Sequence, residues 1–288
     1  MDIKSPTTYE GQIEKIKSRG CVIDDEAFCK DILSRINYYR LTAYFLPFRN
    51  KDRDTYRAGT SFIQVYMMYE FDRRLRALVY KVIEEIEIYV RSKAAYYHGH
   101  KFGALGYKNL SNFNGQHNHE KFIGNINNEI EHSREVPFVK HHIQNYNGQL
   151  PFWVATELFS FGMLSRFYSD LLTTDRKILA KDMFNQNERI VKSWLYCCSS
   201  LRNICAHYGR LYYRDLGAVP ATPKDFSFNF NRKLYSSIMM LKLMQISKDK
   251  WNSEFVHELK SLIDQYEHYI ELKHIGFPPD WEAQLLIN

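Results

Sequence analysis

The sequence predicts an all-α fold built from long helices. Glycine and proline are scarce, with 13 Gly and 8 Pro in 288 residues, against usual shares of about 7% and 5%. Few turn residues in a chain of this length indicate long elements, which in soluble proteins are usually helices. A stripe of apolar residues at helical spacing between residues 62 and 97 gives the same indication. The composition, 45% hydrophobic and 25% charged, excludes a disordered chain.

The first 60 residues are expected to form short helices. One helix covers about residues 9–20 and ends at Gly20. A second begins at the acidic cluster 24–26, where carboxylates match the positive end of the helix dipole. The aromatic run 37–48 is interpreted as a helix end packed on the core, because Pro47 stops a helix near Phe45.

The clearest helix runs from about residue 62 to residue 97. Its apolar positions step by three or four and mark a face turned to the core. They are Phe71, Leu75, Leu78, Val79, Val82, Ile83, Ile86, Tyr89 and Val90. The other face carries Asp72 with Arg76 and Glu87 with Arg91 at i,i+4, pairs worth only about 0.2–0.5 kcal/mol each on an exposed helix.

Residues 99–150 are expected to be a loop-rich insertion, because six glycines and many Asn and His residues fall there. Histidines at 98/100, 117/119 and 141/142 are a possible metal signal. No Cys or carboxylate stands at ligand spacing, however, and neither HExxH nor CxxC occurs. We therefore expect no metal and no cofactor.

The helical pattern returns after Pro151. It covers about residues 151–167, with Trp153 and Phe161 assigned to the core and Gly162 indicating a close helix contact or a kink. Further helices are expected at about 178–184, 190–208, 232–247 and 252–273. No linker or repeat divides the chain. We predict a single domain over 1–288, with an N-terminal helical part of about 1–60, core helices of about 61–215 and C-terminal helices of about 232–273.

Net charge, apolar runs and cysteine count together limit the partners and the compartment that the sequence allows. Lys+Arg 39 against Asp+Glu 33 gives a net charge of +6, which favours an anionic partner. No apolar run approaches the roughly 18 residues of a membrane span, so no membrane partner is expected. Five cysteines, an odd number, and no apolar signal run at the N-terminus indicate a cytoplasmic protein. DNA binding is not expected, because no short recognition helix with exposed polar side chains follows a tight turn.

One segment near the end of the helix at 190–208 carries candidate chemistry. Arg202, Asn203 and His207 combine a permanent cation, an amide and a titratable imidazole. On a helix Asn203 and His207 are about 40° apart and can hydrogen-bond, whereas Arg202 and His207 are about 140° apart. Metal-free RNA cleavage needs a base for the 2′-hydroxyl proton, an acid for the leaving 5′-oxygen and a cation for the phosphorane. Histidine and arginine can supply all three. The alternative interpretation is structural: a histidine that caps the helix, next to an arginine on the surface, would show the same sequence pattern.

The segment resembles a known signature. Arg202-Asn203-Ile204-Cys205-Ala206-His207-Tyr208-Gly209-Arg210-Leu211 is similar to the Arg-x4–6-His signature of HEPN ribonucleases, in the extended form of the bacterial Abi (abortive infection) family. Four further blocks resemble that family in the same order, and together the five span about residues 20–215. The four are residues 36–44, 69–76, 86–91 and 152–165.

The resemblance implies an all-α HEPN core and a metal-independent endoribonuclease that acts as a toxin in phage defence. It implies Arg202 and His207 as the catalytic pair and Asn203 as the polar residue that often follows the arginine. HEPN enzymes generally unite two such motifs and this chain has one, so the resemblance implies a homodimer acting on RNA. An antitoxin, either a protein or a small RNA, is expected to restrain it.

Further residues expected to contact the RNA backbone are basic or aromatic. They are Arg210, Arg214, Arg40, Arg73, Arg74, Arg76 and Tyr208. A solvated helix face explains Arg73, Arg74 and Arg76 equally well. Core packing is the competing interpretation for Tyr208, and also for Tyr212 and Tyr213.

Two carboxylates, Glu87 and Glu157, fall inside the matching blocks. We expect both to be structural, in buried or half-buried ion pairs with Arg91 or Arg202 that align helices. The main alternative for the whole protein is a non-catalytic HEPN-type module that binds RNA or a partner protein. The joint presence of Arg, Asn and His favours the enzyme, since a module that only binds needs no imidazole in register.

Overall fold

A computed structural model describes residues 5–52 and 54–287, so the N-terminal residues on which the absence of a signal run was judged lie mostly outside it. Over the described residues the fold is all-α, as predicted. Extended backbone pairs there only as isolated bridges, at Val22–Ser61, Arg49–Tyr56 and Phe113–Leu171. All five cysteines are buried free thiols. No described helix combines the length and apolar character of a membrane span.

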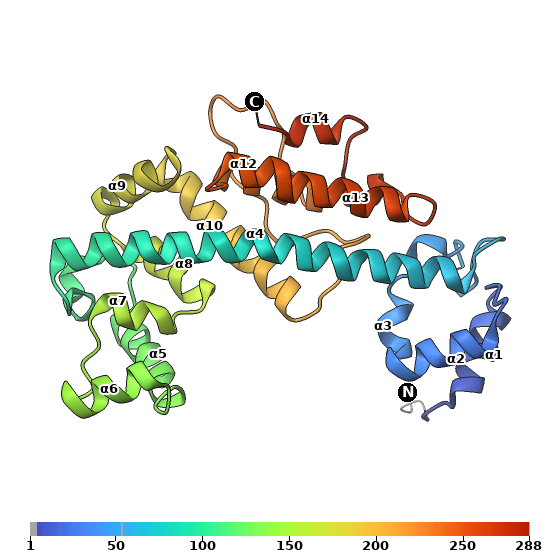
Figure 1. Ribbon diagram of the computed structural model, residues 1–288, viewed down its shortest axis with the longest axis horizontal. Helices are drawn as coiled ribbons and strands as arrows, with labels where there is room; N and C mark the ends of the chain where they lie inside the picture. The colour runs from blue at the N-terminus through green and yellow to red at the C-terminus, as the bar shows by residue number, and fades with distance from the viewer. Residues whose placement is uncertain (1–4, 53, 288) are drawn as a thin grey trace.

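Helix α4, Phe62–Phe102, extends through the whole molecule (Figure 1). Its 41 residues correspond to a length of about 60 Å. The Ser61 side chain caps its start by accepting from the Gln64 N–H, and Gly103, with φ 79°, ends it. The predicted apolar stripe is largely buried, and the helix continues beyond the predicted end at residue 97.

Three short helices pack on the N-terminal end of α4 and form what we call the first arm. They are α1 (Tyr9–Ser18), α2 (Glu26–Arg35) and α3 (Tyr38–Thr42), followed by a 3₁₀ turn at Leu46–Phe48. Side-chain oxygens of Thr8, Asp25 and Asn37 cap the three helices. The Phe28 ring of α2 meets the Tyr66 ring of α4 edge-on, with centroids 5.5 Å apart.

The insertion at 99–150 is not loop-rich throughout, contrary to prediction. Helices α5 (His119–His132) and α6 (Pro137–Asn145) occupy much of it and belong to a second arm, which α7 (Phe152–Ala155) and α8 (Phe161–Asp170) complete. In α5 the apolar residues Phe122 and Ile126 are buried on one face. Because Asn, Glu and His residues surround these two apolar positions, the sequence shows no clear helical periodicity there.

The single helical pattern expected over 151–167 is broken in the structure. Its parts are α7 (Phe152–Ala155), a 3₁₀ turn (Thr156–Leu158) and α8 (Phe161–Asp170). Phe159 is extended, and Ser160 caps α8 by accepting from the Met163 N–H. The break therefore lies before Gly162. Gly162 itself lies against α10 (Glu188–Ala206), but a Cβ there would stand at ordinary van der Waals distance, 3.5 Å, from Ser199 Oγ, so this contact does not require glycine.

Helices α9 (Thr173–Phe184) and α10 (Glu188–Ala206) pack beside α4, and the C-terminal elements cover another side of it. These are α11 (Leu234–Met244), α12 (Lys248–Lys250), a π-helical turn (Trp251–Val256), α13 (His257–Tyr266) and α14 (Trp281–Leu285). The helix predicted at 252–273 therefore ends at Tyr266.

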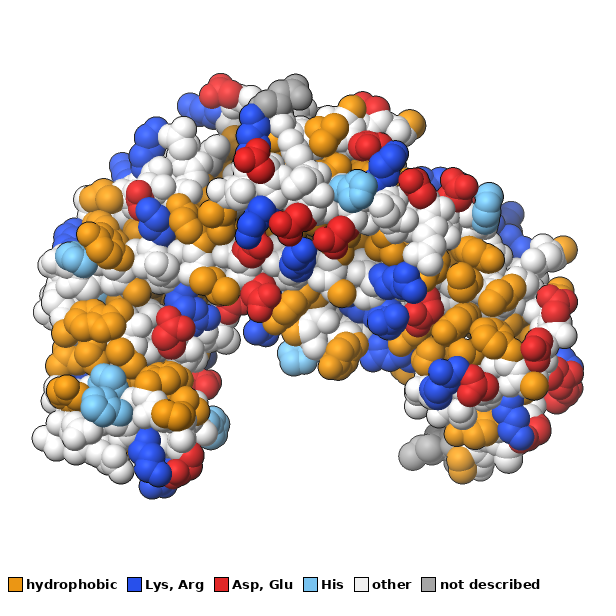
Figure 2. Space-filling model, viewed as in Figure 1, with side chains coloured by type: hydrophobic (Ala, Val, Ile, Leu, Met, Phe, Trp, Pro, Cys, Tyr) orange, Lys and Arg blue, Asp and Glu red, His pale blue; other side chains and the backbone are white. Residues whose placement is uncertain are grey.

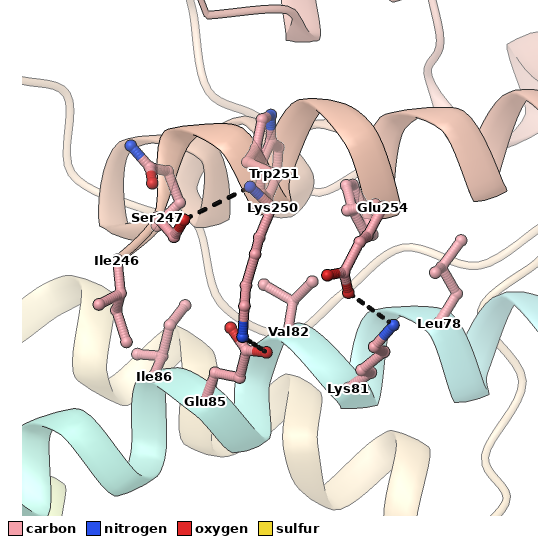
Figure 3. Close-up of a pocket in the computed structure, with 12 residues that line it drawn as sticks. Leu78, Lys81, Val82, Glu85, Ile86, Ile246, Ser247, Lys250, Trp251 and Glu254 are labelled. Carbon is pink, nitrogen blue, oxygen red and sulfur yellow. Dashed lines mark hydrogen bonds and ion pairs between the residues drawn. The ribbon is translucent and has the colours of Figure 1, made fainter.

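Apolar contacts rimmed by ion pairs attach the C-terminal helices to α4 (Figure 3). Leu78 and Val82 face Trp251 across a void of about 30 Å³, which is room for about one water molecule. Lys81 of α4 pairs with Glu254 at 3.0 Å beside it. This contact fastens the helices and is too small to be a substrate site.

The elements form an arch with one hollow side (Figures 1 and 2). The first arm projects from one end of α4, the second arm projects from the other end to the same side, and α12–α14 lie on the opposite side. The C-terminal end of α10 emerges on the hollow side, between the two arms. The segment with the candidate residues therefore ends in the space between the arms.

Candidate active site at the end of helix α10

Helix α10 ends at Ala206, and His207 is its exposed C-cap. Tyr208 follows in the left-handed region at φ 57°. The Gly209 N–H donates to the Ile204 carbonyl at 2.7 Å, which is the closing bond of a Schellman motif. Glycine usually takes the left-handed position of that motif. Here Tyr208 takes it, with 68% of its surface exposed, so for this tyrosine the core interpretation is wrong.

Neighbours in α4 hold Arg202 in place. Its Nε lies 3.5 Å from Glu87 Oε2, and its guanidinium lies 5.9 Å from the centre of the Tyr80 ring. Glu87 also accepts from Arg91 Nη2 at 3.0 Å. The predicted ion pair of Glu87 is therefore present, with both candidate partners. Two arginines share one carboxylate, so the cluster keeps a net positive charge.

Arg91 extends this cluster to the break before α8. Its guanidinium donates to the Thr156 carbonyl and, at 2.9 Å, to the Phe159 carbonyl. The backbone between α7 and α8 is thereby tied to α4 beside Glu87. This explains how carbonyl groups freed by the break find donors.

The side chains of that segment depart from prediction. Glu157 is exposed and has no ion pair with any described residue, so its expected structural pairing is wrong. Trp153 has 51% of its surface exposed and is not in the core. Phe161 is buried, as predicted. Phe152, rather than Trp153, is the residue of α7 that points inward.

Asp72 fixes the loop that follows α10. Its buried carboxylate accepts from the N–H groups of Leu211 at 3.0 Å and Tyr212 at 2.7 Å. The Tyr44 hydroxyl donates to it at 2.6 Å, and Arg76 forms an ion pair with it. Burial raises the pKa of Asp72, and the Arg76 guanidinium and these donors oppose that shift. The Asp72–Arg76 pair, expected on the exposed face of the helix, is thus buried. Arg76 is 5% exposed and is therefore not free to bind a phosphate, contrary to prediction.

Sequence reasoning missed Asp72, although a signal was available. Asp72 stands on the apolar stripe of α4, with Met68, Leu75 and Val79 at i−4, i+3 and i+7. A carboxylate on a buried stripe must be paired, because an isolated buried charge is costly. Its i,i+4 partner Arg76 was assigned to the exposed face instead.

Two of the predicted RNA-binding arginines support the same loop. Arg40 Nη1 donates to the Tyr208 carbonyl at 2.7 Å, and Arg210 donates to the Ala43 carbonyl. Burial lowers the pKa of Arg210. Arg210 therefore joins α10 to the first arm, while the exposed Arg214 reaches the Arg210 carbonyl at 3.4 Å. Tyr212 is buried beneath this loop, as its core interpretation required.

A groove of about 790 Å³ opens beside the end of α10, against α3 and α4. Its basic and aromatic lining residues are Arg40, Arg73, Arg76, Tyr69, Tyr80 and Tyr208. Arg73 also pairs with Glu70 at 2.8 Å. Arg74 lies elsewhere, where it bonds Gln265 of α13 at 2.9 Å. Lys and Arg side chains are visible where the first arm meets the hollow side (Figure 2).

The three motif side chains are not joined by hydrogen bonds within the described chain. The His207 N–H donates to the Asn203 carbonyl at 3.0 Å, which is a backbone bond. Between the side chains of Asn203, His207 and Arg202 no hydrogen bond forms in the described structure, so the expected Asn203–His207 bond is absent here. In one copy of the chain, the His207 imidazole and the Arg202 guanidinium are therefore not bonded to each other.

The predicted histidine pairs serve other contacts. His117 Nδ1 lies 3.0 Å from Asp170 Oδ2, and its Nε2 lies 3.2 Å from His119 Nδ1. Within residues 5–52 and 54–287 no three His, Cys, Asp or Glu side chains are arranged to hold a metal ion.

The fold and the cluster define an all-α protein whose Arg-Asn-x-x-x-His segment ends a helix on the hollow side of an arch. Residues 31–213, more than half of the chain, match the family described as Abi-like protein, and the chain belongs to that family. No curated protein and no solved structure matches it. The match ends at residue 213, so α11–α14 lie beyond it.

Proposed function

We propose that this protein is a metal-independent endoribonuclease of the HEPN type, a cytoplasmic toxin of abortive infection that an antitoxin protein or small RNA restrains. The observation that carries the proposal is the arrangement of Arg202, Asn203 and His207 at the exposed end of α10. Glu87 forms an ion pair with Arg202, 3.5 Å from its Nε and without a hydrogen bond, and the two terminal nitrogens of Arg202 bond no described residue. Those nitrogens match two phosphate oxygens. Membership of the Abi-like family supports a role in defence.

The surroundings of the motif suit RNA. The cluster of Arg202, Arg91 and Glu87 has a net positive charge, which favours a phosphate. The groove of about 790 Å³ adds the exposed Arg73 and three tyrosine side chains, which suit contacts with RNA backbone and stacking on unpaired bases.

The proposed reaction needs two copies of the chain. One His207 takes the proton of the 2′-hydroxyl, and the 2′-oxygen attacks phosphorus. The bond to the 5′-oxygen breaks, and the second His207, or water, donates a proton to that oxygen. The Arg202 pair binds the non-bridging oxygens as charge develops. The products carry a 2′,3′-cyclic phosphate and a 5′-hydroxyl.

Cleavage assays on RNA with purified variants test the proposal. We expect His207→Ala and Arg202→Ala each to lower the cleavage rate about 10²-fold or more, and EDTA to leave it unchanged. The exposed His268 of the C-terminal part provides a matched control, since His268→Ala should cleave normally. Full activity of a folded His207→Ala protein, or loss of cleavage in EDTA, would contradict the mechanism.

Growth of bacteria separates the enzyme from a non-catalytic module. Expression of the wild type should arrest growth, whereas the Arg202→Ala/His207→Ala double variant should not. Sequencing of 5′-hydroxyl RNA ends in the arrested cells then reports the RNA that is cut. Equal growth from both proteins at equal abundance would favour a module that only binds RNA or protein.

A further inference from the structure

The surface beside Glu87 carries exposed aromatic side chains that the proposed chemistry does not use. A groove of about 590 Å³ lies where α7 crosses α4, and Arg91 lines it together with Tyr96 and Trp153. Exposed fractions are 68% for Tyr96 and 51% for Trp153. Exposed aromatic residues gathered around a concave surface are typical of a binding site.

The helix backbone supports the Trp153 indole at Gly99. A Cβ at residue 99 would lie 3.2 Å from the indole Cε3, so any larger residue there would push the ring away. Tyr96, in the preceding turn of α4, packs on His100 with ring centres 4.0 Å apart. Both rings are therefore held by neighbours before any ligand arrives, which lowers the entropy cost of binding.

Glu157 supplies an acceptor at the same groove. It is exposed and has no ion pair with a described residue. Arg91 bonds the carbonyls of Thr156 and Phe159 on either side of it. The backbone that presents the Glu157 carboxylate is thus fixed by the arginine that shares Glu87 with Arg202.

We propose that this groove binds one unpaired guanine of the RNA, and this inference rests on the proposed ribonuclease function. The base stacks on Trp153, and its ring N–H and amino group donate to the two oxygens of Glu157. Guanine alone among the four bases offers two adjacent donors on its pairing edge. Adenine and cytosine place an acceptor beside their donor, and a carboxylate repels that acceptor.

The position of the groove connects it to the proposed chemistry. Arg91 lines the groove and contacts Glu87, and Glu87 contacts Arg202. The groove is therefore within reach, over a few nucleotides, of a strand whose scissile phosphate lies at Arg202. The volume of about 590 Å³ is within the range of ligand pockets, about 300–1,000 Å³.

Binding measurements in the full-length His207→Ala protein test this inference without cleavage. The probes are a fluorescent A10 oligonucleotide and the same strand with one central guanine or one central inosine, which lacks the amino group. We expect the guanine strand to bind about 10-fold tighter than A10, with inosine between them. Trp153→Ala should lower affinity for the guanine strand about 10-fold, and Glu157→Gln should remove the preference while A10 binds as before.

Tryptophan fluorescence gives a direct readout of stacking. Of the 4 Trp, Trp194, Trp251 and Trp281 are buried, so quenching by RNA reports Trp153 and should vanish in Trp153→Phe. Tyr146→Ala removes an exposed aromatic residue outside the groove and should change nothing.

The outcomes separate this inference from the proposed function. Absence of RNA binding and cleavage in the wild type would overturn both. Cleavage by Trp153→Ala and Glu157→Gln with wild-type rate and wild-type cut sites would overturn the guanine site alone. Loss of the dimer in Trp153→Ala, with unchanged affinity for the guanine strand, would assign the groove to a protein contact and overturn it as well.

Discussion

At the residue scale, Tyr208 stands in a backbone conformation that favours glycine. Its φ of 57° costs a side chain about 1–2 kcal/mol, and such strain is often kept at functional sites. Tyr208 lines the groove beside the motif. We predict that Tyr208→Gly raises the free energy of unfolding by about 1 kcal/mol and weakens RNA binding. Urea unfolding and RNA titration measure the two effects.

Tyr213 provides the matched control for this prediction. It is also left-handed, with φ 52°, and partly exposed, but it does not line that groove. Tyr213→Gly should leave RNA binding unchanged, and it should stabilise the fold less than Tyr208→Gly, because the Tyr213 ring packs edge-on against His274 with ring centres 4.9 Å apart. Weaker RNA binding in both variants would show that loop geometry, and not the Tyr208 ring, matters.

His98 predicts a dependence of stability on pH. It is buried among the rings of Phe102, Phe152 and Phe167, without a hydrogen-bond partner for either ring nitrogen. Burial lowers the pKa of His98 to about 4, so between about pH 6.5 and pH 4 the unfolded chain binds a proton that the folded chain refuses. Stability is therefore lost as the pH falls through this range.

The size of the His98 effect follows from the shift. We expect the free energy of unfolding to be about 2 kcal/mol lower at pH 5 than at pH 7. Urea unfolding of the wild type and of His98→Leu measures it, and the variant should lack this part of the pH dependence. Replacing the exposed His132 with leucine should not remove it. A His98→Leu protein with the full dependence would show that other groups cause it.

Which side chains pair across helices was only partly predictable from the sequence. The pair of Glu87 with Arg91 could be predicted, because the two residues are four positions apart in the same helix. Trp153 and Glu157 were misassigned because the helical pattern over 151–167 hides the break at Phe159. In an unbroken helix Trp153 and Glu157 would share a face with the buried Phe161.

At the scale of elements, segments distant in the sequence converge on the end of α10. The 36–44 block provides Arg40 to the Tyr208 carbonyl, and the 69–76 block provides Asp72 to the Leu211 N–H. The 86–91 block provides Glu87 to Arg202. Three of the four further blocks thus have one physical role in common, which is to position the motif and the loop after it.

Asp72 positions the loop through two backbone N–H groups, those of Leu211 and Tyr212. We predict that Asp72→Asn lowers the free energy of unfolding by about 3–5 kcal/mol, because it leaves the Arg76 charge buried without its partner. Asp72→Asn with Arg76→Met should recover part of the loss, since no unpaired charge remains. Urea unfolding of the two variants and the wild type measures both effects.

Asp31 and Arg35 give this prediction a matched control, because they form the same i,i+4 pair on the exposed side of α2. Asp31→Asn should cost less than about 0.5 kcal/mol. Equal losses at Asp72 and Asp31 would mean that burial adds nothing to the Asp72 pair.

Elements with long apolar stripes were predictable, and elements with short ones were not. The stripe of α4 spans most of its 41 residues, so its existence followed from period alone. In α5 only Phe122 and Ile126 are fully buried, and two residues do not define a period. Its Asn118 cap was a readable signal.

At the scale of the molecule, the arch was beyond prediction from the sequence. Periodicity shows which face of each helix is buried, but not that both arms leave α4 on the same side (Figure 1). That arrangement leaves the end of α10 open to a large partner. In a dimer with a net charge of twice +6, RNA binding should weaken steeply with added salt.

Because the side chains of Arg202 and His207 share no hydrogen bond within one copy, we expect the proposed reaction to depend on subunit pairing. If each cleft unites both copies, a wild-type chain paired with an Arg202→Ala/His207→Ala chain has half of its groups and should be nearly inactive. Subunits mixed after mild dissociation should therefore show activity that falls as the square of the wild-type fraction. Mixing Arg202→Ala with His207→Ala chains should give no more activity than the wild-type chain paired with the double variant, because both mixed dimers hold one intact arginine and one intact histidine. Activity in direct proportion to the wild-type fraction would mean that each chain cleaves alone.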